Sequence, residues 1–353
     1  MPATDKLAGL LARVRRATAG HSIYPARKLE PGPTSPAPPV PEHIPPPPYA
    51  LAATSSPPPP PKAPGVGGDV EIFDTPEGLD RMRRVGTLAA AALRLAGRLV
   101  EANDPVAAAA AAATTADGNA HPNTNPPPFL TTDAIDRAVH QFLVSRGAYP
   151  SPLGYHGFPR SVCVAVNECA AHGVPDGAPL QRGDLITVDV TAYLDGVHGD
   201  TNATFFVGGS NAAPNPAALD LVEGAREALS AAIAACGPGV PFREVGNVVQ
   251  READRRGLSV VRELVGHGIG RVFHALPAVA HHREWAARAN RRGVMRLGQT
   301  FTIEPILTLG RNGRLSAPWA RDGWTLTTAD GALAAQFEHT LAIGEDGAEV
   351  LTR

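Results

Sequence analysis

The chain has 353 residues, of which 36 are proline and 36 glycine, and its 32 Lys and Arg residues nearly balance 34 Asp and Glu residues, for a formal net charge of −2. This balance argues against binding of nucleic acid through bulk charge. No apolar run approaches the roughly 18 residues that a membrane-spanning helix needs. The three cysteines, Cys163, Cys169 and Cys236, include no CxxC pair and predict neither a disulfide framework nor a zinc finger. We therefore expect a protein without a membrane or specific nucleic-acid partner.

Proline is concentrated at the N-terminus, where eighteen of the 36 lie in the first 64 residues. Proline disfavours helix interiors and central strands, so residues 1–66 are expected to form a disordered, extended tail before a domain that spans 67–353. Residues 1–30 combine basic side chains with Leu and Val at helical spacing. This pattern is typical of an organelle presequence and equally of a short basic helix in a cytosolic protein, so a cytoplasmic and an organellar (mitochondrial or plastid) location both stay open.

Helix and strand patterns alternate in blocks from residue 74 onward. Asp74-Thr75-Pro76-Glu77 predicts the start of a helix that runs to about Ala102, and residues 104–128 form a low-complexity insert that is expected to be a surface loop. Thr131 or Thr132 is expected to cap a second helix. Blocks of this kind, with hairpins among the strands, predict an α+β fold with a largely antiparallel sheet. Further strands are predicted at 161–167, 185–193, 201–207, 258–265, 300–308 and 334–343, and further helices at 216–235 and 241–257.

The stretch 184–207 carries the strongest chemical signal. Asp195-Gly196 between two strand-like runs predicts a two-residue hairpin turn, which places Asp189 opposite Asn202 and makes Asp200 its diagonal neighbour on the same face. Aspartate is depleted in strands, and two carboxylates at this spacing can converge on metal ions. A solvent-exposed strand face is the alternative, which apolar neighbours in both runs disfavour.

Further ionisable residues lie in apolar contexts. Glu304 lies in FTIEPIL and Glu338 in AQFEHTLAI, where an ionised carboxylate is costly unless it is paired or bound to metal. His267 lies in GHGIG, and His274 follows seven residues later. Each residue alone could be structural. Two Asp, two Glu and one His together favour a pair of divalent ions rather than a structural zinc site.

Five ordered motifs make the sequence resemble a type I methionine aminopeptidase over roughly residues 68–353. PEHIPPPPYA, at 41–50, also resembles the linker before the catalytic domain in eukaryotic-type members, here without the N-terminal zinc finger. The resemblance implies the pita-bread fold, in which two pseudo-symmetric halves surround a dinuclear metal site. The motifs are YHGFPRSVCVAVNECAAHGVPD (155–176), the Asp189/Asp200 hairpin, GHGIGRVFHALP (266–277), FTIEP (301–305) and AQFEHT (335–340).

The resemblance also implies roles for single residues in a metal-dependent aminopeptidase. A hydroxide bridging two divalent ions (Co, Mn, Fe or Zn) would attack the carbonyl of an N-terminal methionine that precedes a small residue, and Glu304 would shuttle its proton. His172 would donate a proton or contact the peptide nitrogen, and His274 would donate to the substrate carbonyl. The implied metal ligands are Asp189, Asp200, His267, Glu304 and Glu338, and the implied methionine pocket is Tyr155, Phe158, Cys163, Phe273 and Trp324.

Nascent polypeptide N-termini are the implied partners, with transient ribosome association and a monomeric state as further expectations. One departure from the family pattern is Ala171, where a cysteine is usual before the proton-donor histidine.

Two alternatives remain for the function. Prolidases and X-prolyl aminopeptidases share a similar ligand set, but they carry His-Glu where this chain has His274-Ala275. Non-catalytic pita-bread proteins lose metal ligands, whereas all five are present here. The remaining histidines, namely His156, His198, His281, His282 and His339, are expected to be structural.

Overall fold

The structure is a computed structural model that describes residues 22–25, 27–52, 70–103, 129–284 and 293–353. The insert 104–128 and most of the candidate presequence therefore lie outside the described residues. Within the described part, no helix combines the length and the hydropathy needed to cross a bilayer.

The first half of the molecule packs two helices behind a sheet. Helix α3 (Pro76–Ala102) begins and ends where the sequence predicts, and its cap is Thr75, whose hydroxyl accepts from the Gly78 N–H. Thr131 caps α5 (Thr132–Val144) in the same way. The antiparallel sheet has the order β1-β4-β2, with β5 paired to β4. Its strands are β1 (Tyr149–Pro150), β2 (Cys163–Val166), β4 (Leu185–Leu194) and β5 (Val197–Phe206).

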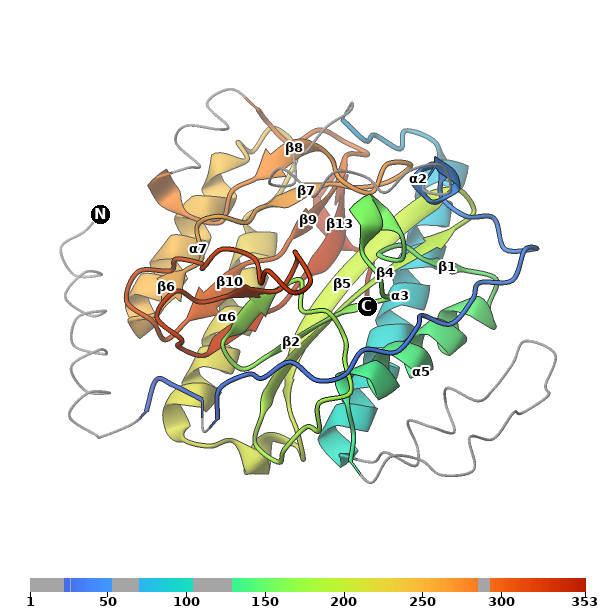
Figure 1. The fold of residues 1–353 in the computed structure, drawn as a ribbon. Coiled ribbons are helices and arrows are strands. Elements are labelled where there is room, and N and C mark those ends of the chain that lie inside the picture. The colour runs from blue at the N-terminus through green and yellow to red at the C-terminus, as the bar shows by residue number, and fades with distance from the viewer. Residues whose placement is uncertain (1–21, 26, 53–69, 104–128, 285–292) are drawn as a thin grey trace.

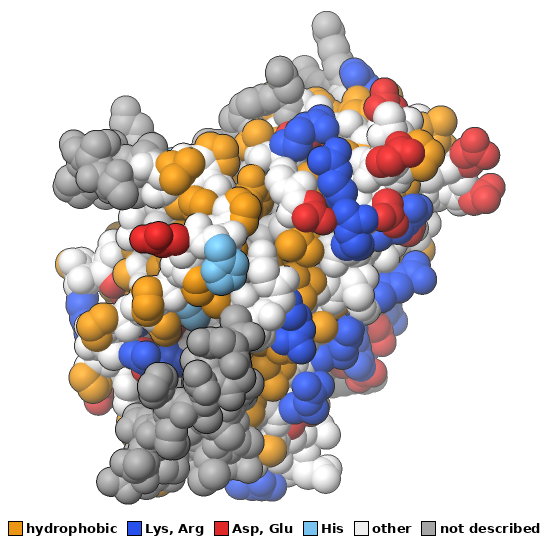
Figure 2. Space-filling view, turned by 90° about the vertical axis from the view of Figure 1, so that its right-hand side faces the viewer, with side chains coloured by type: hydrophobic (Ala, Val, Ile, Leu, Met, Phe, Trp, Pro, Cys, Tyr) orange, Lys and Arg blue, Asp and Glu red, His pale blue; other side chains and the backbone are white. Residues whose placement is uncertain are grey.

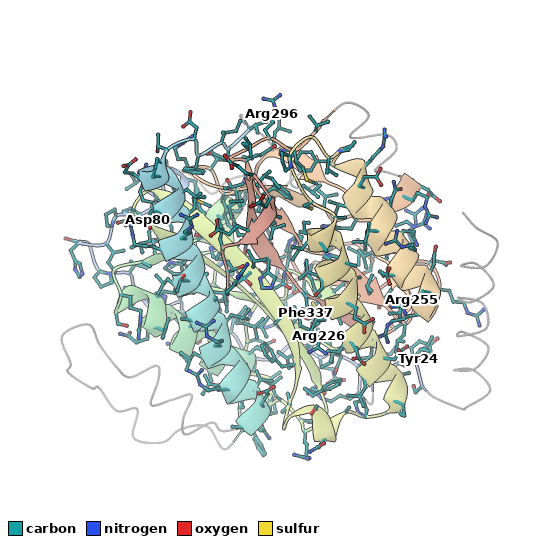
Figure 3. The ribbon with its side chains drawn as sticks, turned by 180° about the vertical axis from the view of Figure 1, so that it is seen from behind. Tyr24, Asp80, Arg226, Arg255, Arg296 and Phe337 are labelled. Carbon is teal, nitrogen blue, oxygen red and sulfur yellow. The ribbon has the colours of Figure 1, made fainter. Side chains whose placement is uncertain are left out.

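The second half repeats this plan. Helices α6 (Pro216–Ala234) and α7 (Arg243–Arg256) cover a three-stranded sheet, β12-β10-β6, and a five-stranded sheet, β14-β13-β9-β7-β8. Seen from behind in Figure 3, α3 and α5 cover one half and α6 and α7 the other, and Phe337 lies between them. The strands are β6 (Ser259–Val260), β7 (Gly266–Gly268), β8 (Ala275–Val279), β9 (Thr300–Ile303), β10 (Ile306–Thr308), β12 (Ala334–Gln336), β13 (His339–Gly344) and β14 (Gly347–Val350), with a small pair of β3 (Cys169–Ala171) and β11 (Leu326–Thr327) elsewhere.

Two strands predicted as continuous are each interrupted at a glutamate. The run 300–308 divides into β9 and β10 at Glu304-Pro305, since proline has no N–H to give to a ladder. The run 334–343 divides into β12 and β13 at Phe337-Glu338. The strand predicted at 258–265 is short, because only Ser259 and Val260 pair with β10. Each break turns a carboxylate out of the sheet ladder.

Threonine hydroxyls join the two halves at the centre of the molecule. The Thr340 hydroxyl donates to the carbonyl of Asp200 (2.8 Å) and accepts from its N–H (3.0 Å). Thr204 makes the equivalent pair of bonds with the backbone of Gln336, at 2.7 and 2.9 Å. Strand β5 of the first half is therefore fixed against β12 and β13 of the second. Figure 1 shows β5 and β13 side by side in the middle of the fold.

Surface ion pairs add little to this framework. Arg83 pairs with Glu349, and Arg84 pairs with Asp80 and Asp195, all of them well exposed. Figure 2 shows a band of Lys and Arg side chains down one face of the molecule, with Asp and Glu among them at its upper end. Exposed pairs of this kind contribute about 0–1 kcal/mol each.

The expectation that residues 1–66 form a disordered tail is wrong for residues 27–52, which lie along the folded domain as an extended arm ending in α2 (Pro48–Ala52). In Figure 1 the arm crosses the front of the molecule in dark blue. Its backbone and side chains bond to groups of the domain: Arg27 to Asp184 (2.6 Å), the Leu29 N–H to Glu168 (2.7 Å), the Gly32 N–H to Asp176 (2.6 Å) and Ser35 to Asp133 (2.5 Å).

Apolar burial then fixes the end of the arm. Ile44 is 2% exposed and packs in a cluster with Val144 and Tyr149. Burying one such side chain contributes about 1.5–3 kcal/mol. Composition predicts correctly that the arm has little regular secondary structure, but it does not predict these contacts.

Candidate active site

A cavity of about 430 Å³ lies between the two halves and collects every site residue expected from the sequence. One end holds ionisable groups and the other an aromatic wall. The lining includes Asp189, Asp200, His267, Glu304, Glu338, His172, His274, Tyr155, Phe158, Cys163, Phe273 and Trp324.

The β4–β5 hairpin has the predicted register. Asp189 faces Asn202, and Asp200 faces Thr191. The turn residues Asp195 and Gly196 have φ values of 52° and 81°, the left-handed pair that a tight hairpin requires. Asp189 and Asp200 consequently point from one face of the hairpin into the cavity.

Neutral donors orient the carboxylates. Asp200 accepts from the Thr191 hydroxyl at 2.7 Å, and Glu338 accepts from the Asn202 amide at 2.7 Å. Glu304 accepts from the Thr302 hydroxyl at 3.0 Å and from the Gln336 amide at 3.3 Å. These four donors, Thr191, Asn202, Thr302 and Gln336, are neutral, so they do not offset the charge of an ionised carboxylate. A bound cation would supply the positive charge that allows these carboxylates to be ionised together.

His267 completes the ionisable end. Its Nδ1 donates to the carbonyl of Gly268 at 3.0 Å, which leaves Nε2 as the lone-pair nitrogen, 3.5 Å from Glu304 and 3.8 Å from Asp200. Burial lowers the pKa of His267 to about 4, so the ring is neutral. Ligand atoms of Asp200, His267 and Glu338 lie within 4.8 Å of one another, and all three residues are buried.

Buried charge dominates the electrostatics of this end. Desolvation raises the pKa of Asp200 to about 7 and the pKa values of Asp189, Glu304 and Glu338 well above their usual values. For the last three, repulsion by neighbouring carboxylates is the next cause. One oxygen of Asp189 and one of Glu338 are buried without a hydrogen-bond partner. Unpartnered carboxylate oxygens beside a neutral histidine fit divalent cations, which bind such oxygen and nitrogen ligands.

The aromatic wall lies beside the ionisable end. Phe158 and Trp324 meet edge to face at 5.2 Å, and the ring of His172 lies 6.2 Å from Trp324. On the other side, Tyr155 stacks on His274 at 5.0 Å. Burial lowers the pKa of His172 to about 4 and the pKa of His274 well below its usual value, so both rings are neutral.

Two histidines expected to be structural lie against this site. His281 accepts the backbone N–H of Glu304 at 3.1 Å and is 2% exposed. His198 is 1% exposed and stacks on Phe273 at 5.2 Å. Burial lowers the pKa of each to about 3. His198 lies two residues before Asp200 in the hairpin, a signal that sequence could have used, whereas nothing local connects His281 to Glu304.

Comparison with known proteins agrees with this geometry. The model of metallopeptidase family M24 matches residues 80–345. The chain belongs to this family. Methionine aminopeptidase 1D, chloroplastic/mitochondrial, from Arabidopsis thaliana is 45% identical over 93% of this chain and 80% of its own length. Methionine aminopeptidase 1C, chloroplastic/mitochondrial, from the same plant is 42% identical over 82% and 74%.

Solved structures extend the likeness to the fold. The methionine aminopeptidase of Rickettsia prowazekii superimposes with a TM-score of 0.67 at 33% identity, covering 80% of this M24 chain and 100% of that one. The prolidase of Pyrococcus furiosus, at 18% identity and a TM-score of 0.54, shares the fold alone, covering 80% of this chain and 65% of that one. The pita-bread fold and the resemblance to type I methionine aminopeptidases are therefore confirmed, and the protein is a metallopeptidase.

Removing divalent metal should destabilise this M24 protein more at pH 8 than at pH 5. Burial raises the pKa of Asp200 from 3.8 to about 7 in the folded chain. The stability linked to this raised pKa is complete below about pH 4 and is lost as pH rises through 7, when the buried group must ionise. Bound cations offset that charge. The loss in Tm on replacing Mn(II) by EDTA should therefore be several degrees larger at pH 8. An equal loss at both pH values would contradict this account.

Proposed function

We propose that this protein is a type I methionine aminopeptidase that removes the initiator methionine of proteins whose second residue is small. The observation that supports this most is the single cavity in which a carboxylate–histidine cluster adjoins an apolar aromatic wall. The names of the relatives at 42–45% identity support the same activity.

The wall suits an unbranched thioether side chain. Tyr155, Phe158, Phe273 and Trp324 provide apolar and aromatic surface, and thioether sulfur packs favourably against aromatic rings. Burial raises the pKa of the Cys163 thiol well above its usual value, so it faces the pocket as a neutral group. We propose these five residues as the methionine pocket.

Two divalent ions, of Co, Mn, Fe or Zn, are proposed at the ionisable end. Asp189, Asp200, His267, Glu304 and Glu338 would hold them. When bound, such ions polarise a carbonyl and lower the pKa of a water. Asp200, His267 and Glu338 could hold one ion together, because their ligand atoms lie within 4.8 Å of one another.

The chain's own residues would then position the peptide and move its protons. Glu304 is suited to accept and hold a proton on a carboxylate oxygen, because burial raises its pKa. Neutral His274 has an Nδ1 without a partner and can donate an N–H to the scissile carbonyl oxygen. Neutral His172 stands across the cavity, where it can contact the nitrogen of the scissile bond.

The main test separates this activity from that of the prolidase fold relatives. Purified protein supplied with Co(II) or Mn(II) should cleave Met-Ala-Ser, because the cavity offers an apolar wall next to the metal ligands. It should turn over Met-Trp-Ser far more slowly, and it should not cleave an Ala-Pro peptide. Cleavage of the prolyl peptide without cleavage of Met-Ala-Ser would refute the proposal.

His172→Ala should lower kcat for Met-Ala-Ser by about 10²–10⁴-fold, the range expected for a general acid–base group. Metal content, measured by elemental analysis, should stay at the wild-type level, because His172 is proposed to contact substrate rather than metal. Loss of bound metal together with activity would instead identify His172 as a ligand.

Nascent chain N-termini are the proposed substrates, with a monomeric enzyme and transient ribosome association as further parts of the proposal. We propose an organellar location, supported by the chloroplastic/mitochondrial names of the relatives and by the basic amphipathic pattern in residues 1–30. Imaging a tagged full-length chain beside one that lacks residues 1–30 tests it. Organellar signal should be lost on deletion, whereas a cytosolic signal from both chains would exclude this location.

A further inference from the structure

The arm contacts the back of the active-site wall through Tyr49. Tyr49, in α2, packs its ring edge to face on Tyr155 at 4.9 Å and parallel to His198 at 6.1 Å, with an interplanar angle of 18°. Tyr49 itself does not line the cavity. It therefore touches the wall from the side opposite the substrate.

The two rings that touch Tyr49 are the ones that hold the wall in place. Tyr155 packs on Phe273 at 4.7 Å and on His274 at 5.0 Å. His198 stacks on Phe273 at 5.2 Å, with an interplanar angle of 11°. Phe273 and His274 are thus connected to the arm through two separate aromatic contacts, each of a kind that contributes beyond simple burial.

Hydrogen bonds fix the position of the Tyr49 ring. Its hydroxyl donates to the carbonyl of Ser151 at 2.5 Å, and the Ser151 hydroxyl bonds to Nδ1 of His198 at 2.9 Å. Burial raises the pKa of Tyr49, which keeps the hydroxyl protonated as a donor. Tyr49, Ser151 and His198 thus form one hydrogen-bonded and stacked unit.

The turn that carries Tyr155 has an unfavourable backbone conformation that packing must stabilise. Gly154, His156 and Gly157 all have φ in the left-handed region, at 79°, 48° and 84°. His156 is unfavourable there, because only glycine adopts that region without strain. A turn of this kind keeps its conformation when packing around it allows no other, and the Tyr49 ring supplies that packing on the outer side.

We propose that Tyr49 is a positioning residue for the methionine pocket, so that the N-terminal arm is a working part of substrate recognition. The proposal rests on the proposed aminopeptidase activity. Tyr49 fixes the position of the Tyr155 ring, and Tyr155 in turn fixes the positions of the Phe273 and His274 rings. Loss of the Tyr49 ring frees the wall to move, while the proposed metal ligands stay anchored on β4, β5 and β7 and at the β9–β10 and β12–β13 breaks.

Steady-state kinetics of the metal-loaded full chain test this with Met-Ala-Ser. Tyr49→Ala should raise KM about tenfold and lower kcat by a smaller factor, because the pocket wall is disturbed directly and His274 only through its contact with Tyr155. Tyr49→Phe keeps both ring contacts and loses only the bond to Ser151, so its KM should stay within about twofold of wild type.

The matched control is Arg27→Ala, which breaks an arm contact with Asp184 remote from the pocket. It should lower Tm without changing KM. If Tyr49→Ala does not fold, Tyr49→Leu, which retains apolar bulk, replaces it. A wild-type KM in folded Tyr49→Ala or Tyr49→Leu, or an equal rise of KM in Arg27→Ala, overturns the proposal. If wild-type protein does not cleave Met-Ala-Ser, the proposed function fails instead, which is a separate result.

Discussion

Four carboxylates buried in one cavity set the central constraint on this molecule. Desolvation raises the pKa values of Asp189, Asp200, Glu304 and Glu338, and repulsion between carboxylates raises those of Asp189, Glu304 and Glu338 further. Four buried carboxylates cannot all stay ionised unless positive charge compensates them, because burying an uncompensated charge is costly. Threonine and amide donors orient the oxygens without neutralising them, and the threonine bonds between β5 and the β12–β13 region hold the two halves at the separation the cluster needs. The interior is therefore built to hold cations.

The repeated plan of the halves explains how ligands so distant in sequence converge. Each half pairs two helices with antiparallel strands, and the ligands project from the surfaces where the halves meet. Three of the proposed ligands, Asp189, Asp200 and His267, lie on regular strands, whereas Glu304 and Glu338 lie where a strand is broken. A broken ladder frees a side chain to point across the interface. Rigid strands and short breaks together give a precise site without a flexible loop.

Sequence predicted the parts of this site that depend on local rules. The Asp195-Gly196 turn fixes the hairpin register, and with it the shared face of Asp189 and Asp200. The presence of a carboxylate in an apolar, strand-like run identified Glu304 and Glu338. The bond from Glu304 to His281 and the stacking of Tyr49 on Tyr155 join segments far apart along the chain, so no periodicity encodes them. The docking of the arm on the domain is not predicted from sequence for the same reason. Proline content indicates how a segment folds by itself, whereas docking depends on the surface it meets.

The path of the arm has a consequence for how the protein is made. Its first described residues bond to much later parts of the chain: the carbonyl of Ile23 accepts from the Leu333 N–H, and the carbonyl of Ser22 accepts from the Asn215 amide. During synthesis the arm leaves the ribosome before the domain does, and Leu333 emerges near the end. The arm can reach its full set of contacts only after translation of the catalytic half-domains is complete, because contacts across such sequence distances form late. Complete docking of the arm thus requires both halves of the domain, although Tyr49 contacts residues of the first half alone.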